Sequence, residues 1–413
     1  MLPEIRNTTR RWRTLPPAAR PADMADTKTG DVIISGGGLV GQTLALALAA
    51  HGLTSIIVDR ADPAKVIAPD FDGRASAIAS ASHKMLEAIG VADRLAGKGC
   101  AIRQIWVSDG LKPGELDFTA RDNDGPLGTM YENRDLRIAL RDAVRETAAI
   151  TLHMPAHAVE TTRGPHGVSV TLNDRTRLAA PLLIAAEGRR SPTREAAGFN
   201  MAYWAYAHSA IIGGIAHERS HDNIAYEIFY PTGPFALLPL PDLDDGRHRS
   251  AFVWSVAKGD APGLLKLGER GFTHELEKRM GGLLGGVTMI APRMAYPLGF
   301  HHSARITADR LALVGDAAHG IHPIAGQGLN LGLRDVAALT EVLVDGARLG
   351  LDLGDAQLMD RYERWRGLDS LSVAVSTDVL TRLFGIPGKT ASAVRRLGLG
   401  AVQASPPLKS LFM

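Results

Sequence analysis

The sequence predicts an α/β protein with a parallel sheet, a second antiparallel sheet inserted into it, and helices at the C-terminus. Two glycine-rich segments, at residues 36–41 and 315–328, each follow a short apolar strand and precede a helix. Between them, residues 203–306 carry short aromatic and apolar runs separated by turn residues, which is typical of antiparallel strands. With 413 residues, the chain is long enough for two or three such modules.

The first predicted unit is a strand, a glycine turn and a helix. An apolar run at residues 31–35 leads into Gly36–Gly41 and then into an alanine- and leucine-rich helix that ends near Gly52. In this G-x-G-x-x-G pattern the first glycine permits a tight turn and the second lets the backbone approach a pyrophosphate. The third lets the helix pack closely on the strand. The helix N-terminus would then point its free N–H groups at the phosphates.

A second strand follows over residues 55–58 and ends at Asp59, 18 residues after Gly41. A carboxylate at this position accepts hydrogen bonds from ribose hydroxyls and disfavours a 2′-phosphate, so the pattern favours a dinucleotide other than NADP in this slot. The pattern does not distinguish NAD from FAD. A glycine-rich structural turn is the alternative interpretation.

The second glycine segment decides between these cofactors. A strand at residues 310–314 leads into Gly315-Asp316, and the run continues through Pro323 to Asn330 and a helix over about 331–343. This string resembles the second FAD signature of the class A flavoprotein aromatic hydroxylases. The fuller run over residues 323–335 is similar to the ubiquinone-biosynthesis hydroxylases within that class. A carboxylate at a strand end can hold the ribitol hydroxyls, and a helix N-terminus at the pyrimidine edge of the flavin favours its reduction.

The resemblance implies a fold, a cofactor and a reaction. The fold would be the Rossmann-like FAD-binding domain of the p-hydroxybenzoate hydroxylase type, with FAD as cofactor and NAD(P)H as transient electron donor. The activity would be O2-dependent hydroxylation of the ring of a lipid-soluble polyprenylated phenol through a C4a-hydroperoxyflavin. A hydroxylase of a small phenol is an alternative, and so is an FAD-binding scaffold subunit of a biosynthetic complex.

Three weaker motifs extend the resemblance. Residues 187–194 are similar to the family's Asp-Gly motif, which serves FAD and the passing NAD(P)H, but Glu187 stands at the Asp position. This longer side chain puts the docking of the nicotinamide in doubt. Arg134, at the start of a predicted helix, matches the family arginine near the pyrophosphate, and Arg74 would lie on the flavin side. The alternative for each arginine is a solvated surface charge.

Together, the motifs and the resemblance define the expected site. His322 and Pro323 are the candidates for a direct chemical role, although a histidine in such a turn is more often structural. The expected cofactor-binding residues are Gly36, Gly38, Leu39, Val40, Gly41, Asp59, Arg60, Arg74, Arg134, Val159, Glu187, Gly188, Gly315, Asp316, Pro323, Gly326, Gln327, Gly328, Leu329 and Asn330. No metal site is expected.

The predicted domains follow the order of these motifs. Within the middle region, residues 230–240 resemble the strand pair that forms the wall over the flavin, and a plain sheet core is the alternative. Residues 346–413 are helical in character, with an apolar stripe that either packs on the sheet or docks on a membrane surface or a partner. The expected division is 1–30 as a disordered extension, 31–105, 132–200 and 305–345 as the FAD-binding domain, 106–131 and 201–304 as the substrate domain, and 346–413 as the C-terminal region.

Composition and charge exclude several classes of protein and of binding site. The net charge of +2 argues against nucleic-acid binding, and the single cysteine excludes an internal disulfide or a cysteine-based metal cluster. No apolar run is long enough to span a membrane. We expect a cytoplasmic protein, peripheral on the inner membrane if it meets a lipid-soluble substrate or partners of a ubiquinone-biosynthesis complex. The basic stretch before Met24 suggests that natural translation begins at Met24.

Overall fold

The computed structural model describes residues 27–68, 74–111, 116–120, 125–320, 327–367, 369 and 403. Several sequence predictions fall outside these ranges. They include the disordered extension as far as residue 26 with its Met24 start, and the apolar stripe beyond residue 370. The site residues His322, Pro323 and Gly326 also fall outside the described residues.

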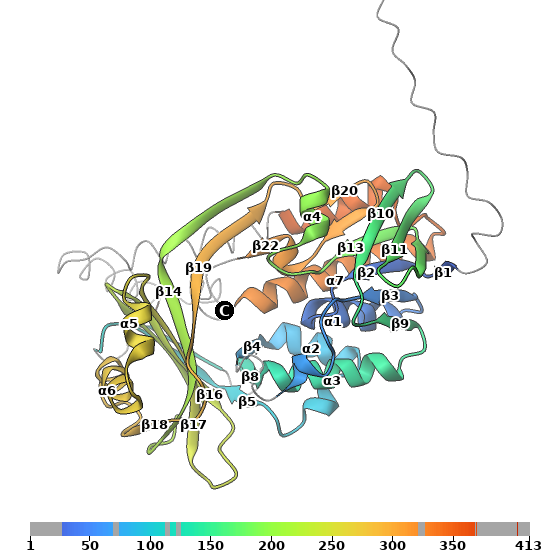
Figure 1. Cartoon of the computed structure of the whole chain (residues 1–413). Helices are drawn as coiled ribbons and strands as arrows, with labels where there is room; N and C mark the ends of the chain where they lie inside the picture. Colours follow the sequence, from blue (N-terminus) through green and yellow to red (C-terminus); the bar gives the residue numbers. More distant parts are fainter. Residues whose placement is uncertain are drawn as a thin grey trace, which may run out of the picture.

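The fold is built on a six-stranded sheet whose strands come from distant parts of the chain (Figure 1). Its order is β20-β21-β13-β2-β3-β9, and all neighbouring pairs are parallel except β20 with β21. Both faces of this sheet are covered, one by helices and the other by a smaller sheet, so its strands are continuous apolar runs. The bounds are β20 Thr307–Ala308, β21 Leu311–Leu313, β13 Leu182–Ala185, β2 Val32–Ser35, β3 Ser55–Val58 and β9 Ile150–His153.

Two small sheets flank this one. A four-stranded sheet has the order β1-β12-β11-β10, and a three-stranded sheet has the order β4-β8-β5. Their bounds are β1 Thr27–Thr29, β12 Arg177–Ala180, β11 Gly167–Leu172, β10 Ala158–Gly164, β4 Ala75–Ala79, β8 Gly128–Glu132 and β5 Cys100–Ile102. The helices around them are α1 Leu39–Ala49, α2 Ser80–Ala88, α3 Asn133–Glu146, α4 Pro192–Ala196 and α7 Gln327–Arg348, with short 3-10 turns η2 Lys65–Ile67, η3 Ala92–Leu95 and η4 Gly315–Ala317.

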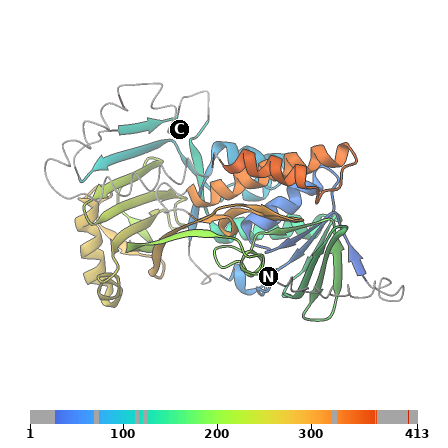
Figure 2. The same cartoon turned by 90° about the horizontal axis from the view of Figure 1, so that it is seen from above.

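A large second sheet stands beside this α/β part (Figures 1 and 2). Its path is β22-β19-β14-β17-β16-β15-β6-β7, with β18 paired to β14. All pairs are antiparallel except β15 with β6, which is parallel. The bounds are β22 His319–Gly320, β19 Met294–Ser303, β14 Met201–His217, β17 His248–Ala257, β16 Gly233–Leu240, β15 Ile224–Tyr230, β6 Gln104–Asp109, β7 Leu116–Thr119 and β18 Val287–Met289.

The two helices α5 (Ala261–Lys266) and α6 (Glu269–Met280) cover the outer face of this sheet. Phe272 and Leu276 of α6 lie in one buried cluster with Tyr226 and Ile228 of β15. The long strands β14 and β19 run from this sheet to the six-stranded sheet and connect the two parts (Figure 1). The opposite face of the large sheet is therefore turned toward the α/β part.

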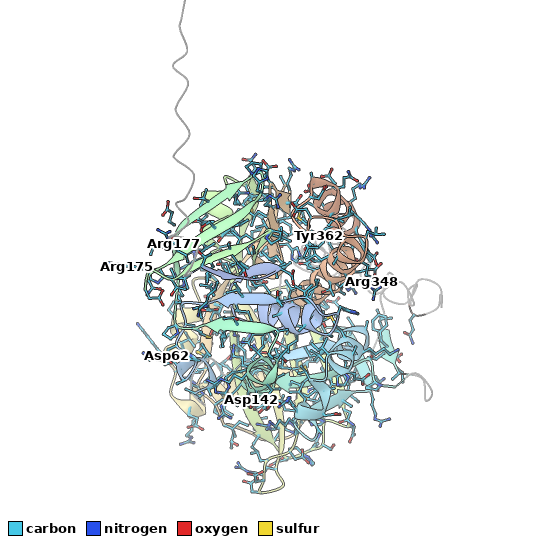
Figure 3. All side chains as sticks on the ribbon, turned by 90° about the vertical axis from the view of Figure 1, so that its right-hand side faces the viewer. Asp62, Asp142, Arg175, Arg177, Arg348 and Tyr362 are labelled. Carbon is cyan, nitrogen blue, oxygen red and sulfur yellow. The ribbon has the colours of Figure 1, made fainter. Side chains whose placement is uncertain are left out.

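Beyond α7, the described chain forms a further helix over residues 356–367. Tyr362, labelled in Figure 3, is fully buried in this helix, and its hydroxyl donates a hydrogen bond to the carbonyl of Leu313 in β21, 2.9 Å away. This contact ties the helix to the six-stranded sheet. It is consistent with packing on the sheet, the plainer of the two interpretations for this part of the C-terminal region.

The structure confirms the expected parallel sheet and the expected antiparallel sheet, and it corrects several predicted boundaries. The prediction of disorder up to residue 30 is wrong for β1, because its alternating threonines pair in parallel with β12 at the sheet edge. The helix expected over about 331–343 is longer, since α7 begins at Gln327 and ends at Arg348. The expected boundary at residue 105 falls inside β6, and β8 pairs with β4 and β5 rather than with the large sheet. These pairings join residues far apart in sequence, so local patterns do not reveal them.

Candidate functional site

In the first glycine turn, close packing requires Gly36 and Gly41 to lack a side chain, but it does not require this of Gly38. A Cβ on Gly36, whose φ is +112°, would lie 2.4 Å from the carbonyl oxygen of Ala186, and a Cβ on Gly41 would lie 1.9 Å from that of Gly36. A Cβ on Gly38, in contrast, would have no heavy atom of the described chain within 4 Å beyond its sequence neighbours. Packing therefore explains Gly36 and Gly41, whereas open space lies beside Gly38.

That open space adjoins the N-terminus of α1. Gly38 caps the helix without a side-chain hydrogen bond, and the fully described first turn contains no acidic residue. The N–H groups at the start of a helix lack intrahelical acceptors and attract anions. Leu39, Val40 and Gly41 form this turn, so their placement fits the expected pyrophosphate contact.

Asp59 lies at the end of β3, beside the same turn. Its Oδ2 accepts a hydrogen bond from the Gly37 N–H at 2.6 Å, and its Oδ1 accepts one from the Ala61 N–H at 2.7 Å. The carboxylate is half-buried, and each oxygen keeps a second lone pair that a ribose hydroxyl can use. Arg60 next to it is exposed. The arrangement fits a ribose at this position.

The fold brings the second glycine segment directly onto the first. A Cβ on Gly315 would lie 3.2 Å from Val40 Cγ2, and a Cβ on Gly332 in α7 would lie 2.9 Å from the same atom and 3.2 Å from the Cα of Gly315. The helices α1 and α7 therefore meet through small residues. Sequence reasoning missed Gly332, although its spacing of four residues from Gly328 places both on one face of a helix.

Within α7, Gly328 and Asn330 differ in their environments. A Cβ on Gly328 would meet no described atom within 4 Å. The Asn330 side chain is buried and binds β4, since its Oδ1 accepts a hydrogen bond from the Ala79 N–H at 2.9 Å and its Nδ2 donates to the Ala77 carbonyl at 2.8 Å. The backbone of Asn330, and not its amide group, is therefore the part that fits a cofactor contact. Gln327 and Leu329 lie in the same first turn of α7.

Asp316 projects from η4, which follows the end of β21. Of the residues from 311 to 320, all of them described, it is the exposed one. Its backbone turn is held by side chains from three elements: Gly315 N–H donates to Asp335 Oδ2 at 2.8 Å, His301 Nε2 binds the Asp316 carbonyl at 2.8 Å, and Arg194 Nη1 donates to the Ala317 carbonyl at 3.1 Å. An exposed carboxylate on a rigid turn fits the expected ribitol contact.

A buried charged cluster stands behind this turn. Asp335 of α7 is fully buried, with His319 Nε2 at 2.7 Å from one oxygen and Arg366 Nε donating to the other at 2.6 Å. Burial acts to lower the pKa of His319, but the Asp335 carboxylate outweighs it and the pKa is raised. Burial likewise acts to raise the pKa of Asp335, yet His319 and Arg366 hold it below its ordinary value. The sequence offered no role for Asp335 or Arg366, because their partners are far apart in the chain.

Glu187 is held by four donors from its surroundings. Ser35 Oγ donates to it at 2.7 Å, Thr193 Oγ1 at 2.9 Å and the Thr193 N–H at 3.1 Å, and the hydroxyl of the fully buried Ser191 donates as well. The carboxylate therefore joins the end of β2 to the start of α4. Its longer side chain is accommodated by local hydroxyl groups. Gly188, with a φ of +79°, turns the chain beyond it.

We expect Glu187→Ala to lower the free energy of unfolding by about 1–3 kcal/mol, because buried donors such as the Ser191 hydroxyl lose their acceptor. Chemical denaturation of the FAD-free protein measures this change. Glu195→Ala is the matched control, since Glu195 lies on the same short helix with a side chain that is 69% exposed, and it should have little effect. Equal losses in the two variants would contradict the structural role of Glu187.

The remaining expected site residues make contacts with other groups or are exposed at the surface. Arg134 Nε donates to the Ile67 carbonyl at 2.7 Å, so part of its guanidinium is used within the protein. The guanidinium carbon of Arg74 lies 5.9 Å from the ring centre of Tyr296 in β19. Val159 is 60% exposed at a β-bulge of the edge strand β10. Their cofactor contacts remain predictions.

Comparisons with known proteins identify the family. Residues 29–369 match the family model described as FAD binding domain. The chain is 45% identical over 398 residues to "Ubiquinone hydroxylase UbiL" of Rhodospirillum rubrum, covering 96% of this chain and 92% of the relative. It is 31% identical to "Ubiquinone biosynthesis monooxygenase COQ6, mitochondrial" of Mus musculus, covering 93% and 90%. The chain belongs to the FAD-dependent ubiquinone-biosynthesis hydroxylase family.

Membership of this hydroxylase family confirms the predicted cofactor and enzyme class: the protein is an FAD-dependent monooxygenase. The fold agrees, since the crystal structure of P. aeruginosa PqsL in complex with 2-aminobenzoylacetate is similar with a TM-score of 0.76 at 20% identity, covering 92% of this chain and all of that one. None of the helices in the described ranges is long and apolar enough to cross a membrane. The described residues also contain no His, Cys, Asp or Glu group suited to a metal ion.

Proposed function

We propose that this hydroxylase acts on the aromatic ring of a polyprenylated phenol in ubiquinone biosynthesis. Its overall reaction consumes the phenol, O2, NAD(P)H and a proton, and yields the hydroxylated ring, NAD(P)+ and water. The names of the two relatives support the substrate class. The observation in the structure that carries the proposal is an apolar wall on the face of the large sheet that is turned toward the α/β part.

This wall is a row of six side chains, one from each of six adjacent strands, on the face of the large sheet that is turned toward the α/β part. Each of these side chains stands directly opposite the next one on the neighbouring strand. Five are apolar and the sixth is a carboxyl. We call this row the sheet wall; it consists of Val107, Glu227, Ala236, Val253, Ile212 and Met294.

The side chains that neighbour the sheet wall along the strands show which face of the large sheet carries it. Ala225 and Leu240 on the same face pack against Cys100 and Met130 of β5 and β8, whereas the alternate residues face α6. Val107, Val253, Ile212 and Met294 are partly exposed rather than buried, although they are apolar. Partly exposed apolar side chains that face another part of the protein suit a hydrophobic ligand.

The residues of this chain divide the work of such a reaction. When bound, FAD supplies the redox chemistry that brings electrons from NAD(P)H and an oxygen atom from O2 to the ring. Gly38 and the start of α1 would hold its pyrophosphate, Asp59 its ribose and Asp316 its ribitol. The open backbone at Gly328 would approach the ring edge. The sheet wall would exclude water and hold the apolar substrate.

The proposal also covers the location of the enzyme in the cell and its partners. A long isoprenoid tail keeps the substrate in a lipid phase, so we place the enzyme in the cytoplasm at the surface of the inner membrane, with peripheral contact and with partners of a ubiquinone-biosynthesis complex. His322 and Pro323, the candidates for a direct chemical role from the sequence, remain part of this proposal.

Turnover of the FAD-reconstituted protein tests this function. We expect NAD(P)H oxidation to be stimulated by a prenylated phenol, and labelled O2 to place one oxygen atom in the product ring, as measured by mass spectrometry. The same phenol without its prenyl group is the control for the substrate class. Stimulation by the small phenol alone would favour a small-phenol hydroxylase. Bound flavin without any substrate-dependent oxidation would favour a scaffold subunit.

A further inference from the structure

Glu227 is the carboxyl group in the sheet wall, at the centre of β15. Its neighbours across the sheet are Val107 on β6 and Ala236 on β16, and both are apolar. The adjacent residues Tyr226 and Ile228 point to α6 on the outer face. Because side chains alternate along a strand, Glu227 points to the other face, toward the α/β part.

The carboxyl of Glu227 is buried without a partner in the described chain. The residue is 8% exposed, and within the described ranges its side chain makes no hydrogen bond or ion pair. Burial alone raises its pKa to about 8. At neutral pH the group is therefore largely protonated, and it can both donate and accept a hydrogen bond.

A largely buried carboxyl that makes no hydrogen bond within the described chain contributes little to the stability of the fold, so the fold itself does not explain this side chain. Asp335, the other deeply buried carboxylate considered above, is in contrast fully satisfied by His319, Arg366 and the Gly315 N–H. Polar groups that weaken a fold are characteristic of binding sites, where a ligand supplies the missing partner. In the sheet wall, such a ligand meets five apolar side chains and one hydrogen-bonding group.

We propose that Glu227 binds the ring hydroxyl of the phenolic substrate and thereby orients the ring against the sheet wall. This inference rests on the proposed function, because it assumes a phenolic substrate. A phenol offers one O–H donor and one oxygen acceptor, which match the two capacities of a carboxyl group. The apolar residues around Glu227 would contact the rest of the ring and the start of the tail.

Ligand pairs that differ only at the hydroxyl test this assignment. The FAD-loaded protein is titrated with a monoprenylated phenol and with its methyl ether, and the dissociation constants are read from the change in the flavin absorbance. The wild type should bind the phenol about tenfold more tightly than the ether, because one hydrogen bond of ordinary strength is at stake. Glu227→Leu should bind the two ligands equally, and Glu227→Gln should keep most of the preference.

Two controls separate a binding role from damage to the fold. Glu275→Gln changes a carboxylate on α6, which covers the opposite face of the same sheet, and should leave the preference for the phenol unchanged. The FAD-free Glu227→Leu protein should unfold at the same temperature as the wild type or at a higher one, because an unpaired buried carboxyl has been removed. A lowered melting temperature of Glu227→Leu would contradict the unpartnered state on which the proposal stands.

The result that overturns the proposal is an undiminished preference for the phenol in Glu227→Leu. A wild type that hydroxylates a prenylated phenol but binds the phenol and its ether equally overturns it as well, and leaves the proposed function intact. A wild type that neither binds nor hydroxylates any prenylated phenol overturns the proposed function itself, and the assignment of Glu227 with it.

Discussion

Gly38→Val should abolish the retention of FAD while lowering the stability of the FAD-free protein by no more than about 1 kcal/mol, the cost of a poorer N-cap residue. A Cβ at Gly38 meets no described atom within 4 Å beyond its sequence neighbours, and the backbone of Gly38 has φ −76° and ψ −169°, which a β-branched residue adopts without strain. Its methyl groups would fill the space that the pyrophosphate needs at the N-terminus of α1. The flavin absorbance per protein after reconstitution and gel filtration measures the loss.

Gly41→Ala provides the matched comparison. A single Cβ at Gly41 would lie 1.9 Å from the carbonyl oxygen of Gly36, so the turn and the helix must move apart. We expect this variant to lose FAD and also to melt at a lower temperature in its FAD-free form. If Gly38→Val kept its FAD, or if it destabilised the FAD-free protein as much as Gly41→Ala does, the assignment of the open space beside Gly38 would be wrong.

The second large effect is expected at the buried cluster behind η4. Asp335→Ala removes the buried carboxylate that holds Arg366 and His319, and it leaves the buried Arg366 with its other carboxylate partner, the partly exposed Asp369. Breaking a buried pair in this way costs about 3–5 kcal/mol of the free energy of unfolding. It also releases the Gly315 N–H, so FAD retention should fall because the turn that carries Asp316 loses one of its three attachments.

Asp345→Ala is the control for this prediction. Asp345 pairs with Arg361 at 2.9 Å, but both side chains are at least 40% exposed, so its loss should cost at most about 1 kcal/mol. Chemical denaturation of both variants in their FAD-free forms measures the difference. Similar losses for Asp335→Ala and Asp345→Ala would contradict the role given to the buried cluster.

The pH dependence of the cluster follows from the directions of its pKa shifts. The raised pKa of His319 contributes stability that is complete below its unfolded value of about 6.5 and is lost as the pH rises through the folded pKa. The lowered pKa of Asp335 contributes stability that is present above about 3.8 and is lost as the pH falls through the folded pKa. The stability difference between the wild type and Asp335→Ala should therefore be largest between about pH 4 and pH 6.5.

The amino-acid sequence was most informative where function depends on local backbone chemistry. The segment Gly36–Gly41 and the Gly315-Asp316 pair were recognisable because a tight turn beside a strand demands glycine at fixed spacings. The strands β2 and β3 were recognisable because buried strands are apolar and β-branched. The resemblance carried by these segments led to FAD and to the hydroxylase family, which the comparisons confirmed.

Residues whose roles depend on distant partners could not be predicted in this way. Asp335 appeared only as the end of a motif, and Arg366 carried no signal, since neither reveals which charges it will meet when α7 packs beside the sheet. Gly332 had a helical spacing but no visible neighbour until Val40 and Gly315 came against it. Glu227 had the sequence of an ordinary strand residue, because the burial of a side chain depends on what covers each face.

The sequence by itself therefore determined the cofactor, the two kinds of sheet and the glycine turns, since each follows from preferences of short segments that hold wherever the segment lies. Only the tertiary structure decided how the two turns converge through Val40, which buried charges stabilise η4, and which face of the large sheet carries Glu227. These features depend on contacts between segments up to three hundred residues apart. The free energy of such contacts comes from burial and pairing, and both exist only after the chain has folded.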